Sequence, residues 1–371
     1  MKILFLCGSL ELGYDGVGDY TRRLACELVQ KGHEVKAISL KEKSFLQEKE
    51  EIQILDGIEL SVVRIPSNAS TNKLKNFLER NINAFDPHWI SFQFVIYAYH
   101  PKGLPFYLPG FLKSIRGNFK WHIMFHEIWI GFTSISPIKH KVVGSIQKRI
   151  IKKIVSSIQP KSITTTNLLY QAILKRSNTN TTIINLFSNI DISPLTSAFS
   201  NFVLKKLSIA EGGRKDWIIL GIFGNLYPEA KLEPTLNFQY NQALESSKKV
   251  AFIGFGRMND DGMKEFLRLE NIFVDKISFL HLGERNEDEI SQLLQMLDIG
   301  ISCTPSQHIG KSGVFAAMKY HGLHVILPNG DFIPEYEDVI QQNQNILMKK
   351  PSEQWGASYI SNRYNEIFLN R

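Results

Sequence analysis

The chain has 371 residues, of which 43% are hydrophobic and 21% charged, and its formal net charge at pH 7 is +7. These values are typical of a folded globular protein and exclude an intrinsically disordered chain. The length predicts two domains of roughly 150 to 200 residues each. No apolar run approaches the roughly 20 residues that a membrane span needs, and the apolar start at residues 1–8 is too short for a signal peptide. A cytoplasmic location is expected.

Cysteine and positive charge narrow the classes further. Cys7, Cys26 and Cys303 lack the spacing of a metal site or a disulfide framework, which predicts reduced, buried thiols. The segment from Lys139 to Arg176 holds nine Lys and Arg residues and no Asp or Glu. A solvated helix face explains this charge as well as binding of an acidic saccharide or peripheral contact with the inner face of a membrane does. No nucleic-acid-binding motif accompanies it, so nucleic acid is not an expected partner.

The chain opens with an apolar run at residues 2–7, which predicts a strand buried on both faces. A glycine-rich loop, an amphipathic helix ending near residues 31–32 and a second strand at 33–39 follow. The loop lacks the Gly-x-Gly-x-x-Gly pattern of dinucleotide-binding proteins. Gly16 and Gly18 instead indicate a loop that lets another molecule approach the start of the helix closely.

Strands and helices alternate through the rest of the first half. Strands are predicted at 52–55, 59–65, 89–94, 121–126, 161–165 and 181–187, and helices at 72–84, 106–116, 138–158 and 167–176. This alternation predicts a doubly wound α/β sheet with functional residues at the carboxyl ends of its strands. His126 and Glu127 stand at such an end, before a loop rich in aromatic residues and glycine. Hydrogen-bonded packing is the common role of such a histidine, but this loop favours a site.

Regular periodicity lapses from about residue 187 to 216, and the alternation restarts at Trp217. Strands are predicted at 217–223, 250–255 and 276–281, and helices at 231–247, 260–269 and 286–296. A second α/β sheet is therefore expected. The terminal segment from Pro351 predicts an amphipathic helix with one face formed by Trp355, Tyr359, Tyr364 and Ile367.

Residues 297–322 predict a strand, a loop and a helix. Gly310 and Gly313 lack side-chain bulk, Ser312 offers a hydroxyl and Lys311 a cation, so that helix N–H groups and an ammonium could converge on one anion. A P-loop is excluded because Pro305 stands where that motif needs glycine. The alternative is a surface lysine beside an ordinary helix start.

Several of these segments resemble GT-B glycosyltransferases, especially the sugar-nucleotide-dependent family that includes bacterial mannosyl- and glucosyltransferases of polysaccharide and glycolipid synthesis (family 4-like). Residues 16–35 resemble its first loop, helix and second strand, residues 224–231 the start of its donor domain, and residues 322–325 its Gly-Leu-Pro-Val signature. His126 occupies the place of its active-site histidine. Two features depart: Asn225 replaces an expected arginine, and the usual two glutamates are absent near His308 and Ala316.

The resemblance implies an α/β GT-B fold, in which two Rossmann-like domains face each other across a cleft. The expected division is an acceptor-binding domain at 1–195, a linker at 196–215, a donor-binding domain at 216–350 and a terminal helix at 351–371 that crosses back to the N-terminal domain. The implied function is a metal-independent glycosyltransferase, by type a hexosyltransferase, that moves a sugar from a nucleotide-sugar donor to a saccharide, lipid-linked or small-molecule acceptor. A GT-B-like sugar-nucleotide epimerase and a non-catalytic sugar-nucleotide or saccharide-binding protein stay open as alternatives.

The same resemblance assigns roles to residues. The expected catalytic residues are His126, Lys231 and Lys311, and those expected to bind the acceptor are Asp19, Tyr20 and Glu127. The residues expected to bind the donor are Gly16, Val17, Gly18, Asn225, Tyr227, Gly283, Glu284, Arg285, His308, Gly310, Ser312 and Gly313. No Asp-x-Asp arrangement is placed to hold a metal, so the protein itself is expected to stabilise the leaving diphosphate. No metal or cofactor is expected, because the nucleotide sugar is a substrate.

Overall fold

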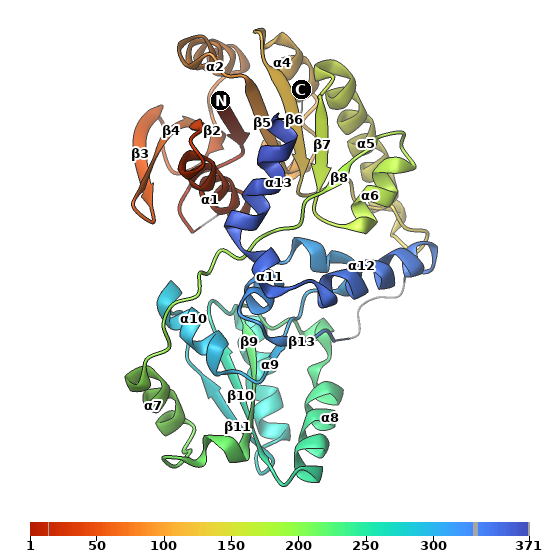
Figure 1. Ribbon diagram of the computed structural model, residues 1–371. Helices are drawn as coiled ribbons and strands as arrows, with labels where there is room; N and C mark the ends of the chain where they lie inside the picture. Colours follow the sequence, from red (N-terminus) through yellow and green to blue (C-terminus); the bar gives the residue numbers. More distant parts are fainter. Residues whose placement is uncertain (14, 329–332, 370–371) are drawn as a thin grey trace. The chain divides into compact units, whose positions relative to one another are not determined.

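The computed structural model describes residues 1–13, 15–328 and 333–369. Contacts between residues divide the chain into two units. Unit 1 comprises Met1–Asn185, Ile333–Val339 and Ala357–Arg371, and unit 2 comprises Leu186–Phe332 and Ile340–Gly356. Each unit is built on a sheet of its own, with helices packed on its faces (Figure 1).

The sheet of unit 1 has the strand order β3-β4-β2-β1-β5-β6-β7-β8. The strands are β1 (Lys2–Cys7), β2 (Glu34–Glu42), β3 (Lys49–Leu55), β4 (Ile58–Pro66), β5 (Trp89–Phe94), β6 (Lys120–Phe125), β7 (Ser162–Thr165) and β8 (Thr182–Ile183). All neighbours pair in parallel except β3, which pairs antiparallel with β4. The order reverses between β1 and β5, and such switch points are where open α/β sheets bind ligands.

The burial of these strands explains their sequences. Every residue of β5 is buried, and in β1 every residue except Lys2 is buried. Such strands are read in the sequence as continuous apolar runs. The strands β3 and β4 instead form a hairpin through Asp56 and Gly57, whose φ angles of 50° and 77° suit a tight two-residue turn. The strand expected at 181–187 is shorter because only Thr182–Ile183 pairs with β7.

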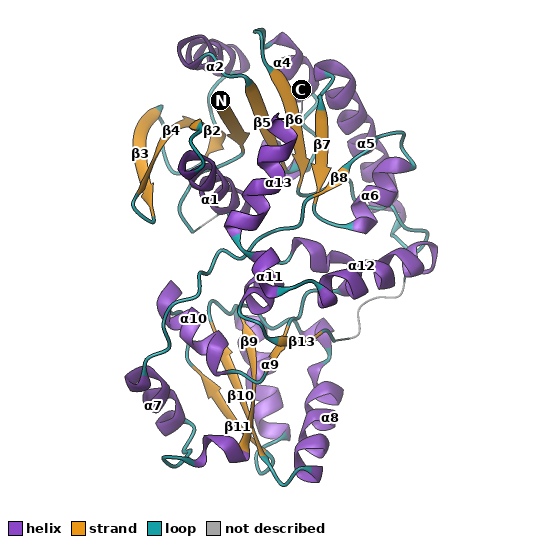
Figure 2. Ribbon diagram, in the orientation of Figure 1, coloured by secondary structure: helices purple, strands orange, loops and turns teal. Residues whose placement is uncertain are grey.

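Helices cover both faces of this sheet (Figure 2). Helix α1 (Gly16–Gln30) packs beside α13 (Ala357–Leu369), while α4 (Leu108–Ser114) packs against α5 (Ile138–Ile158). The remaining helices are α2 (Thr71–Phe85), α3 (Ile96–Tyr99) and α6 (Leu168–Lys175). Helix α5 has the bounds expected from its periodicity, whereas the four-residue α3 is too short to give a periodic signal.

The C-terminal helix α13 belongs to unit 1. The Tyr364 hydroxyl lies 3.1 Å from that of Tyr20, and the indole of Trp89 donates to the carbonyl of Phe368 at 3.0 Å. The helix begins at Ala357 and not at Pro351. Trp355, expected on this helix, lies in the turn η5 (Ser352–Trp355) and packs in unit 2. Residues 370–371 of the expected helix lie outside the described residues.

The sheet of unit 2 has the order β11-β10-β9-β12-β13, and all its pairs are parallel. The strands are β9 (Trp217–Phe223), β10 (Lys249–Phe255), β11 (Ile277–His281), β12 (Ile299–Ile301) and β13 (His324–Ile326). The order reverses between β9 and β12, which places the switch point of this unit there. The alternation that restarts at Trp217 therefore does form a second sheet.

The helices of unit 2 follow the same pattern. They are α7 (Ser197–Lys206), α8 (Leu232–Glu245), α9 (Asp260–Ile272), α10 (Glu287–Met296), α11 (Gly313–Tyr320) and α12 (Glu337–Lys349). The short 3-10 turns of this unit are η1 (Gly213–Asp216), η2 (Pro228–Ala230) and η3 (Ser306–Lys311). The turn η4 (Pro334–Tyr336) and the first turn of α12 belong to unit 1. The segment 196–215, expected as a linker, holds α7, and its Val203, Leu207 and Ile209 are buried in the core of unit 2. Only Val203 is buried within α7 itself, so the helix gives little periodic signal.

Two expectations from composition can be compared with the structure. Cys7, Cys26 and Cys303 are buried free thiols, as predicted. Burial raises the pKa of Cys26 to about 11 and that of Cys303 to about 12, which keeps both thiols protonated at neutral pH. Among the described helices, none combines the length and the apolar character that a membrane crossing needs.

Candidate functional site

The first loop of unit 1 is fixed at the start of α1. Asp15 caps this helix, because its carboxylate accepts from the N–H of Gly18 at 2.7 Å. A Cβ added to Gly18 would lie 2.5 Å from the carbonyl oxygen of Ser9, whereas one added to Gly16 would meet nothing within 4 Å. The close approach at Gly18 is therefore made by the protein's own chain. Only Gly16 leaves open space at the helix start.

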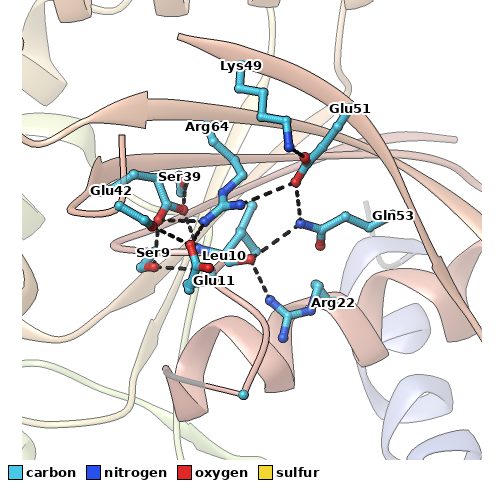
Figure 3. Close-up of polar contacts among 12 residues, drawn as sticks. Ser9, Leu10, Glu11, Arg22, Ser39, Glu42, Lys49, Glu51, Gln53 and Arg64 are labelled. Atoms are coloured by element: carbon cyan, nitrogen blue, oxygen red, sulfur yellow. Dashed lines mark hydrogen bonds and ion pairs between the residues drawn. The ribbon is translucent and has the colours of Figure 1, made fainter. Parts of the chain in front are cut away.

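A buried ionic cluster anchors the same loop (Figure 3). Arg64 on β4 pairs with Glu42 at 3.1 Å, with Glu51 at 3.4 Å and with Glu11. The carboxylate of Glu42 also accepts from the N–H of Leu10 at 2.6 Å. Further hydrogen bonds to Glu42 come from Ser9 at 2.9 Å and Ser39 at 2.5 Å. The ends of β2 and β4 thus hold the loop that leads into α1.

The pKa values of this cluster follow from competing causes. Burial alone raises the pKa of Glu42, but hydrogen bonds from Arg64, Ser39, Leu10 and Ser9 hold it below its usual value. The hydrogen bond from Ser44, with that from Arg64, lowers the pKa of Glu11 against a smaller effect of burial. All the acids therefore stay ionised around Arg64 at neutral pH.

His126 follows β6, at the carboxyl edge of the sheet. Its side chain is 6% exposed, and its ring meets that of Tyr20 edge-on at 5.1 Å. Its Nε2 lies 2.8 Å from Oε1 of Gln93 on β5. An amide oxygen only accepts, so Nε2 carries the hydrogen and Nδ1 is left as an acceptor. Burial lowers the pKa of His126 to about 3, so the ring is neutral at neutral pH.

The contact with Gln93 is the end of a longer chain of buried hydrogen bonds. Gln93 Nε2 donates to Ser91 Oγ at 2.8 Å, and Ser91 lies 2.8 Å from Nδ1 of His122. His122 Nε2 in turn lies 2.9 Å from Thr164 Oγ1 on β7. Burial lowers the pKa of His122 to about 3. One direction of donation satisfies every step, so this chain fixes the tautomer and orientation of His126.

The residues expected to bind the acceptor are engaged within unit 1. Asp19 pairs with Arg22 and accepts from the N–H of Gly13 at 3.1 Å. Tyr20 is 3% exposed and lies behind His126, against Tyr364 of α13. Glu127 is partly exposed beside His126. Of these three, Glu127 is the one whose side chain combines exposure with a place beside His126.

A cavity of about 580 Å³ lies at the carboxyl ends of β1 and β2. Its walls carry both signs of charge, with Glu11, Asp15 and Glu42 facing Lys41 and Lys43. The nearby switch point is narrow, because a Cβ added to Gly8 would lie 2.5 Å from that of Ala98. This cavity is thus lined by the anchored first loop and is large enough for a small polar molecule.

In unit 2, three neighbouring strands end in glycines that have positive φ. Gly224 follows β9 with φ 84°, Gly256 follows β10 with φ 87°, and Gly283 follows β11 at φ 69° after one intervening residue. Gly224 N–H donates to the carbonyl of Phe255, and Gly256 N–H to that of Gly283, both at 2.8 Å. L-residues rarely adopt such φ values, so each loop depends on its glycine. The edge they form has little side-chain bulk.

The loop after β9 carries Asn225 and Tyr227. Asn225 Oδ1 accepts from the N–H of Asn259 at 3.0 Å, so it joins the loops after β9 and β10. The backbone of Tyr227 hydrogen-bonds the thiol of Cys303 at the end of β12. Asn225 and Tyr227 also line a pocket of about 350 Å³, whose walls carry the acids Glu229, Asp261 and Glu265 and the cations Lys264 and Arg268. Lys264 pairs with Asp261 and Arg268 with Glu265, so this pocket has no excess of positive charge for a diphosphate.

The start of α11 lies at the switch point of unit 2. Ser312 caps the helix, accepting from the N–H of Phe315 at 3.2 Å, and its Oγ lies 2.8 Å from that of Thr304. Gly313, the first helical residue, is exposed, and the first N–H groups of a helix have no partner within it. A Cβ added to Gly224 would touch Val314 at 3.6 Å, so the loop after β9 contacts this turn. The expected helix start is therefore confirmed in position.

The other expected donor residues are spread along the edge. Gly310 is buried within η3, and Lys311 ends that turn directly before the cap. Burial and the charge of Lys311 lower the pKa of the partly buried His308 to about 4. Gly283, Glu284 and Arg285 follow the edge strand β11, away from α11, and Glu284 pairs with Arg257 at 3.2 Å.

Lys231 lies between η2 and α8, with φ 49°. It is exposed, and within the described part of the chain its ammonium forms no ion pair. The described residues also contain no group of three or more His, Cys, Asp and Glu that could hold a metal ion.

Three further residues at these edges were not expected from the sequence: Gln93, Arg64 and Arg257. Gln93 and Arg64 are polar residues inside apolar strands, which is the one sequence signal that points to them. Their partners are far away in the sequence and could not be read from it.

The topology and the two sheets define a GT-B fold of two Rossmann-like domains, and comparison with solved structures agrees. The chain is similar to an α,α-trehalose-phosphate synthase (UDP-forming) from Burkholderia xenovorans in complex with glucose-6-phosphate, with 8% identity, a TM-score of 0.61 and 100% of both chains covered. It is similar to a glycosyltransferase from Rickettsia africae ESF-5, with 14% identity, a TM-score of 0.56 and coverage of 100% and 99%.

A third similar structure is sucrose-phosphate synthase from Thermosynechococcus elongatus, with 12% identity, a TM-score of 0.55 and coverage of 100% of this chain and 97% of that one. No family model matches the chain, and no curated protein matches it by sequence. These similarities establish the GT-B fold. They leave the activity to be argued from the residues.

Proposed function

We propose that the chain is a glycosyltransferase that moves a sugar from a nucleotide-sugar donor to a saccharide, lipid-linked or small-molecule acceptor. The observation that carries this proposal is the open start of α11 at the switch point of unit 2, with exposed Gly313 next to the cap Ser312 and Lys311 directly before it. Free N–H groups and the helix dipole favour a diphosphate at such a position. The positive-φ glycines along the same edge leave room for it.

The chemistry required of unit 2 is stabilisation of a leaving nucleoside diphosphate. Negative charge grows on the diphosphate oxygen as the bond to the sugar breaks, so groups directed at that oxygen lower the barrier. Lys231 and Lys311 are the cations assigned to this role, together with the N–H group of Gly313. The N–H of Ser312, also expected here, already donates to the carbonyl of Ile309 at 3.1 Å. Asn225, which replaces the expected arginine, already joins two loops through Asn259. The proposal therefore gives the second charge to Lys311, without a metal.

The part assigned to unit 1 is to hold the acceptor and the transferred sugar. His126 is neutral and presents Nδ1 as an acceptor, so it suits a sugar hydroxyl donor and not acid–base catalysis at neutral pH. Glu127, beside it, and the cavity at the first loop offer polar groups for further hydroxyls. Gln93 acts as a positioning residue, because it reaches the substrate only through His126.

The experiment is incubation with a panel of nucleotide sugars, with and without saccharide acceptors, and measurement of released nucleoside diphosphate. Acceptor-dependent release, or slow hydrolysis in its absence, supports the proposal. Formation of an isomeric nucleotide sugar without release would contradict it and favour an epimerase. Binding of nucleotide sugars without any turnover would contradict it in favour of a non-catalytic binding protein.

A further inference from the structure

A second pocket in unit 1, of about 320 Å³, is lined by cations and aromatic rings. Its cations lie on α5 and next to the end of α6, and its rings come from the loop after β6 and from η4. The three cations are Lys141, Lys148 and Arg176, and the three rings are those of Trp129, Phe132 and Tyr336. All these residues belong to unit 1. No acidic residue is among those that line it.

Two glycines build this pocket by letting the loop after β6 cross α5 closely. A Cβ added to Gly144 would lie 1.8 Å from the carbonyl oxygen of Ile130, and one added to Gly131 would lie 2.2 Å from that of His140. Gly131 also has a φ of 67°. The buried Gln147 completes the crossing, because its side-chain oxygen accepts from the N–H of Ile130 at 3.0 Å. The aromatic residues of the loop are thus held against the helix that carries two of the cations.

The cations are ordered by contacts that do not neutralise them. The ammonium of Lys148 lies 5.4 Å from the ring centroid of Trp129, and the guanidinium of Arg176 lies 4.3 Å from that of Tyr336. Lys141 donates to the carbonyl of Ser134 at 2.5 Å. Among the described residues none of the three forms an ion pair with a carboxylate. Such cation–π contacts fix a cation's position and keep its charge.

Glu335, next to the lining residue Tyr336, is an acid whose charge acts on Arg176. Its carboxylate accepts from the N–H of Ser134 at 2.5 Å. The side chain of Ser134, then the N–H groups of Glu335 and Ser134, and more weakly Arg176, lower its pKa, so Glu335 stays ionised as one acid beside three cations. The pocket therefore keeps an excess of positive charge at neutral pH. Three like charges close together repel, and a bound anion would relieve that repulsion.

We propose that this pocket binds the phosphate group of a small phosphorylated saccharide, with the sugar ring against Phe132. A phosphate offers oxygen acceptors to all three cations, and its charge matches theirs. Trp129 and Tyr336 are only 6% and 5% exposed and carry cations on their rings, so the partly exposed Phe132 offers the apolar surface for the C–H groups of a sugar ring. The pocket lies on the loop that starts at His126, so its ligand is the acceptor of the transfer; this assignment, unlike the binding itself, rests on the proposed function.

The geometry distinguishes this ligand from a membrane surface. The exposed Lys152 and Lys153 on the same helix would contact a flat anionic surface, but they are not among the residues that line the pocket. The cations that line the pocket are instead held by aromatic rings around a space of this size, which fits one compact anion.

Thermal unfolding and calorimetry of the full chain test the proposal, with glucose 6-phosphate, glucose and inorganic phosphate as probes at constant ionic strength. Glucose 6-phosphate should bind more tightly than inorganic phosphate, and glucose should not bind measurably. Lys148→Gln and Arg176→Gln should each weaken the binding of glucose 6-phosphate about tenfold, the loss expected for one charge-assisted contact. Lys152→Gln is the matched control and should bind as the wild type does.

Equal weakening in Lys152→Gln would show unspecific attraction and overturn the proposal. Binding of vesicles with anionic lipid through Lys148 and Arg176, without any binding of glucose 6-phosphate, would overturn it in favour of a lipid surface. Consumption of nucleotide sugars by the wild type is measured separately. If the wild type consumes no nucleotide sugar but binds glucose 6-phosphate through Lys148, the proposed function is contradicted while the proposed phosphate-binding pocket is supported.

Discussion

The carboxyl edges of the two sheets are built in opposite ways. In unit 1, the polar groups at the strand ends bond to one another, as Glu42 does to Arg64 and His126 does to Gln93. In unit 2, three loops begin with positive-φ glycines, and Lys231 forms no ion pair within the described part of the chain. These internal contacts hold the side chains of the first edge in place before a ligand binds. The second exposes backbone N–H groups and charge that the protein leaves unneutralised.

This difference fits two tasks in one transfer reaction. A complete hydrogen-bond network fixes side chains in one geometry before a ligand arrives, which is what orientation of an acceptor requires. Helix N–H groups and cations directed at one position favour an anion there, which is what a leaving diphosphate supplies. Substitutions should therefore affect mainly folding at the first edge and mainly turnover at the second.

The largest expected effect on stability is that of Arg64→Ala. It leaves Glu42, which is fully buried, without its cation, and removal of one partner from a buried pair costs about 3–5 kcal/mol. The control in unit 2 is Lys264→Ala, because Lys264 and its partner Asp261 have side chains that are 77% and 75% exposed. That exposed pair should contribute about 0–1 kcal/mol. Urea unfolding measures both, and equal losses would contradict the contrast between buried and exposed pairs.

The same cluster predicts a dependence on pH. The pKa values of Glu11, Glu42 and Glu51 are lowered in the folded state, so the folded protein binds fewer protons than the unfolded chain in acid. Their stabilisation is present above the ordinary carboxyl pKa of 4.5 and is lost as the pH falls through the lowered values. In Arg64→Ala, the free energy of unfolding should therefore depend less on pH in acid than it does in the wild type. An unchanged dependence on pH would show that other carboxyl groups cause the loss of stability in acid.

The largest expected effect on turnover is that of Lys231→Ala. Loss of one electrostatic contact to the leaving group typically lowers the rate roughly 100-fold, or about 2.7 kcal/mol, and donor affinity should fall less. Lys311→Ala should behave in the same way. Lys264→Ala, an exposed lysine paired with Asp261 on α9, is the control. Steady-state kinetics with the true donor test this prediction. Wild-type turnover in Lys311→Ala would show that the start of α11 is an ordinary helix start and not a phosphate site.

A smaller effect is expected at Gln93. Gln93→Leu removes the acceptor for Nε2 of His126, a loss of about 1 kcal/mol for one hydrogen bond, or up to about tenfold in turnover. Gln93→Glu keeps an acceptor but places a carboxylate beside the ring, which should raise the pKa of His126 from about 3. As the pH is lowered, the ring of His126 should then become protonated, and the variant should lose activity, at a higher pH than the wild type does. Nitrogen NMR of His126 reads the tautomer, and an unchanged tautomer in Gln93→Leu would show that Gln93 does not set it.

The contrast between the edges also explains what the sequence could predict. Doubly buried parallel strands are continuous apolar runs, so β5 and β9 were predicted with their observed bounds. The start of α11 was also predicted, because a serine cap and glycines are local signals. The role of Trp355 was predicted wrongly, since its spacing fits a helix face that begins only at Ala357.

The network of unit 1 could not be predicted in the same way. The partners Glu42 and Arg64, and likewise Gln93 and His126, come together through pairing of strands far apart in the sequence. The residues expected to bind the acceptor show the consequence. Tyr20 was assigned from its place in the first loop, but the helix turns it inward onto His126.

The smallest effect concerns the cap of α11. Ser312→Ala removes the hydroxyl that accepts from Phe315, which should cost about 1 kcal/mol in stability, whereas Ser312→Gly should cost only a few tenths. If the first N–H groups of α11 bind the diphosphate, fraying of this turn in Ser312→Ala should also weaken donor binding severalfold. Ser70→Ala, which removes the cap of α2 in unit 1, should cost similar stability and leave donor affinity unchanged. Calorimetry with the nucleotide compares the two caps, and equal donor affinities would show that the helix start in unit 2 serves folding alone.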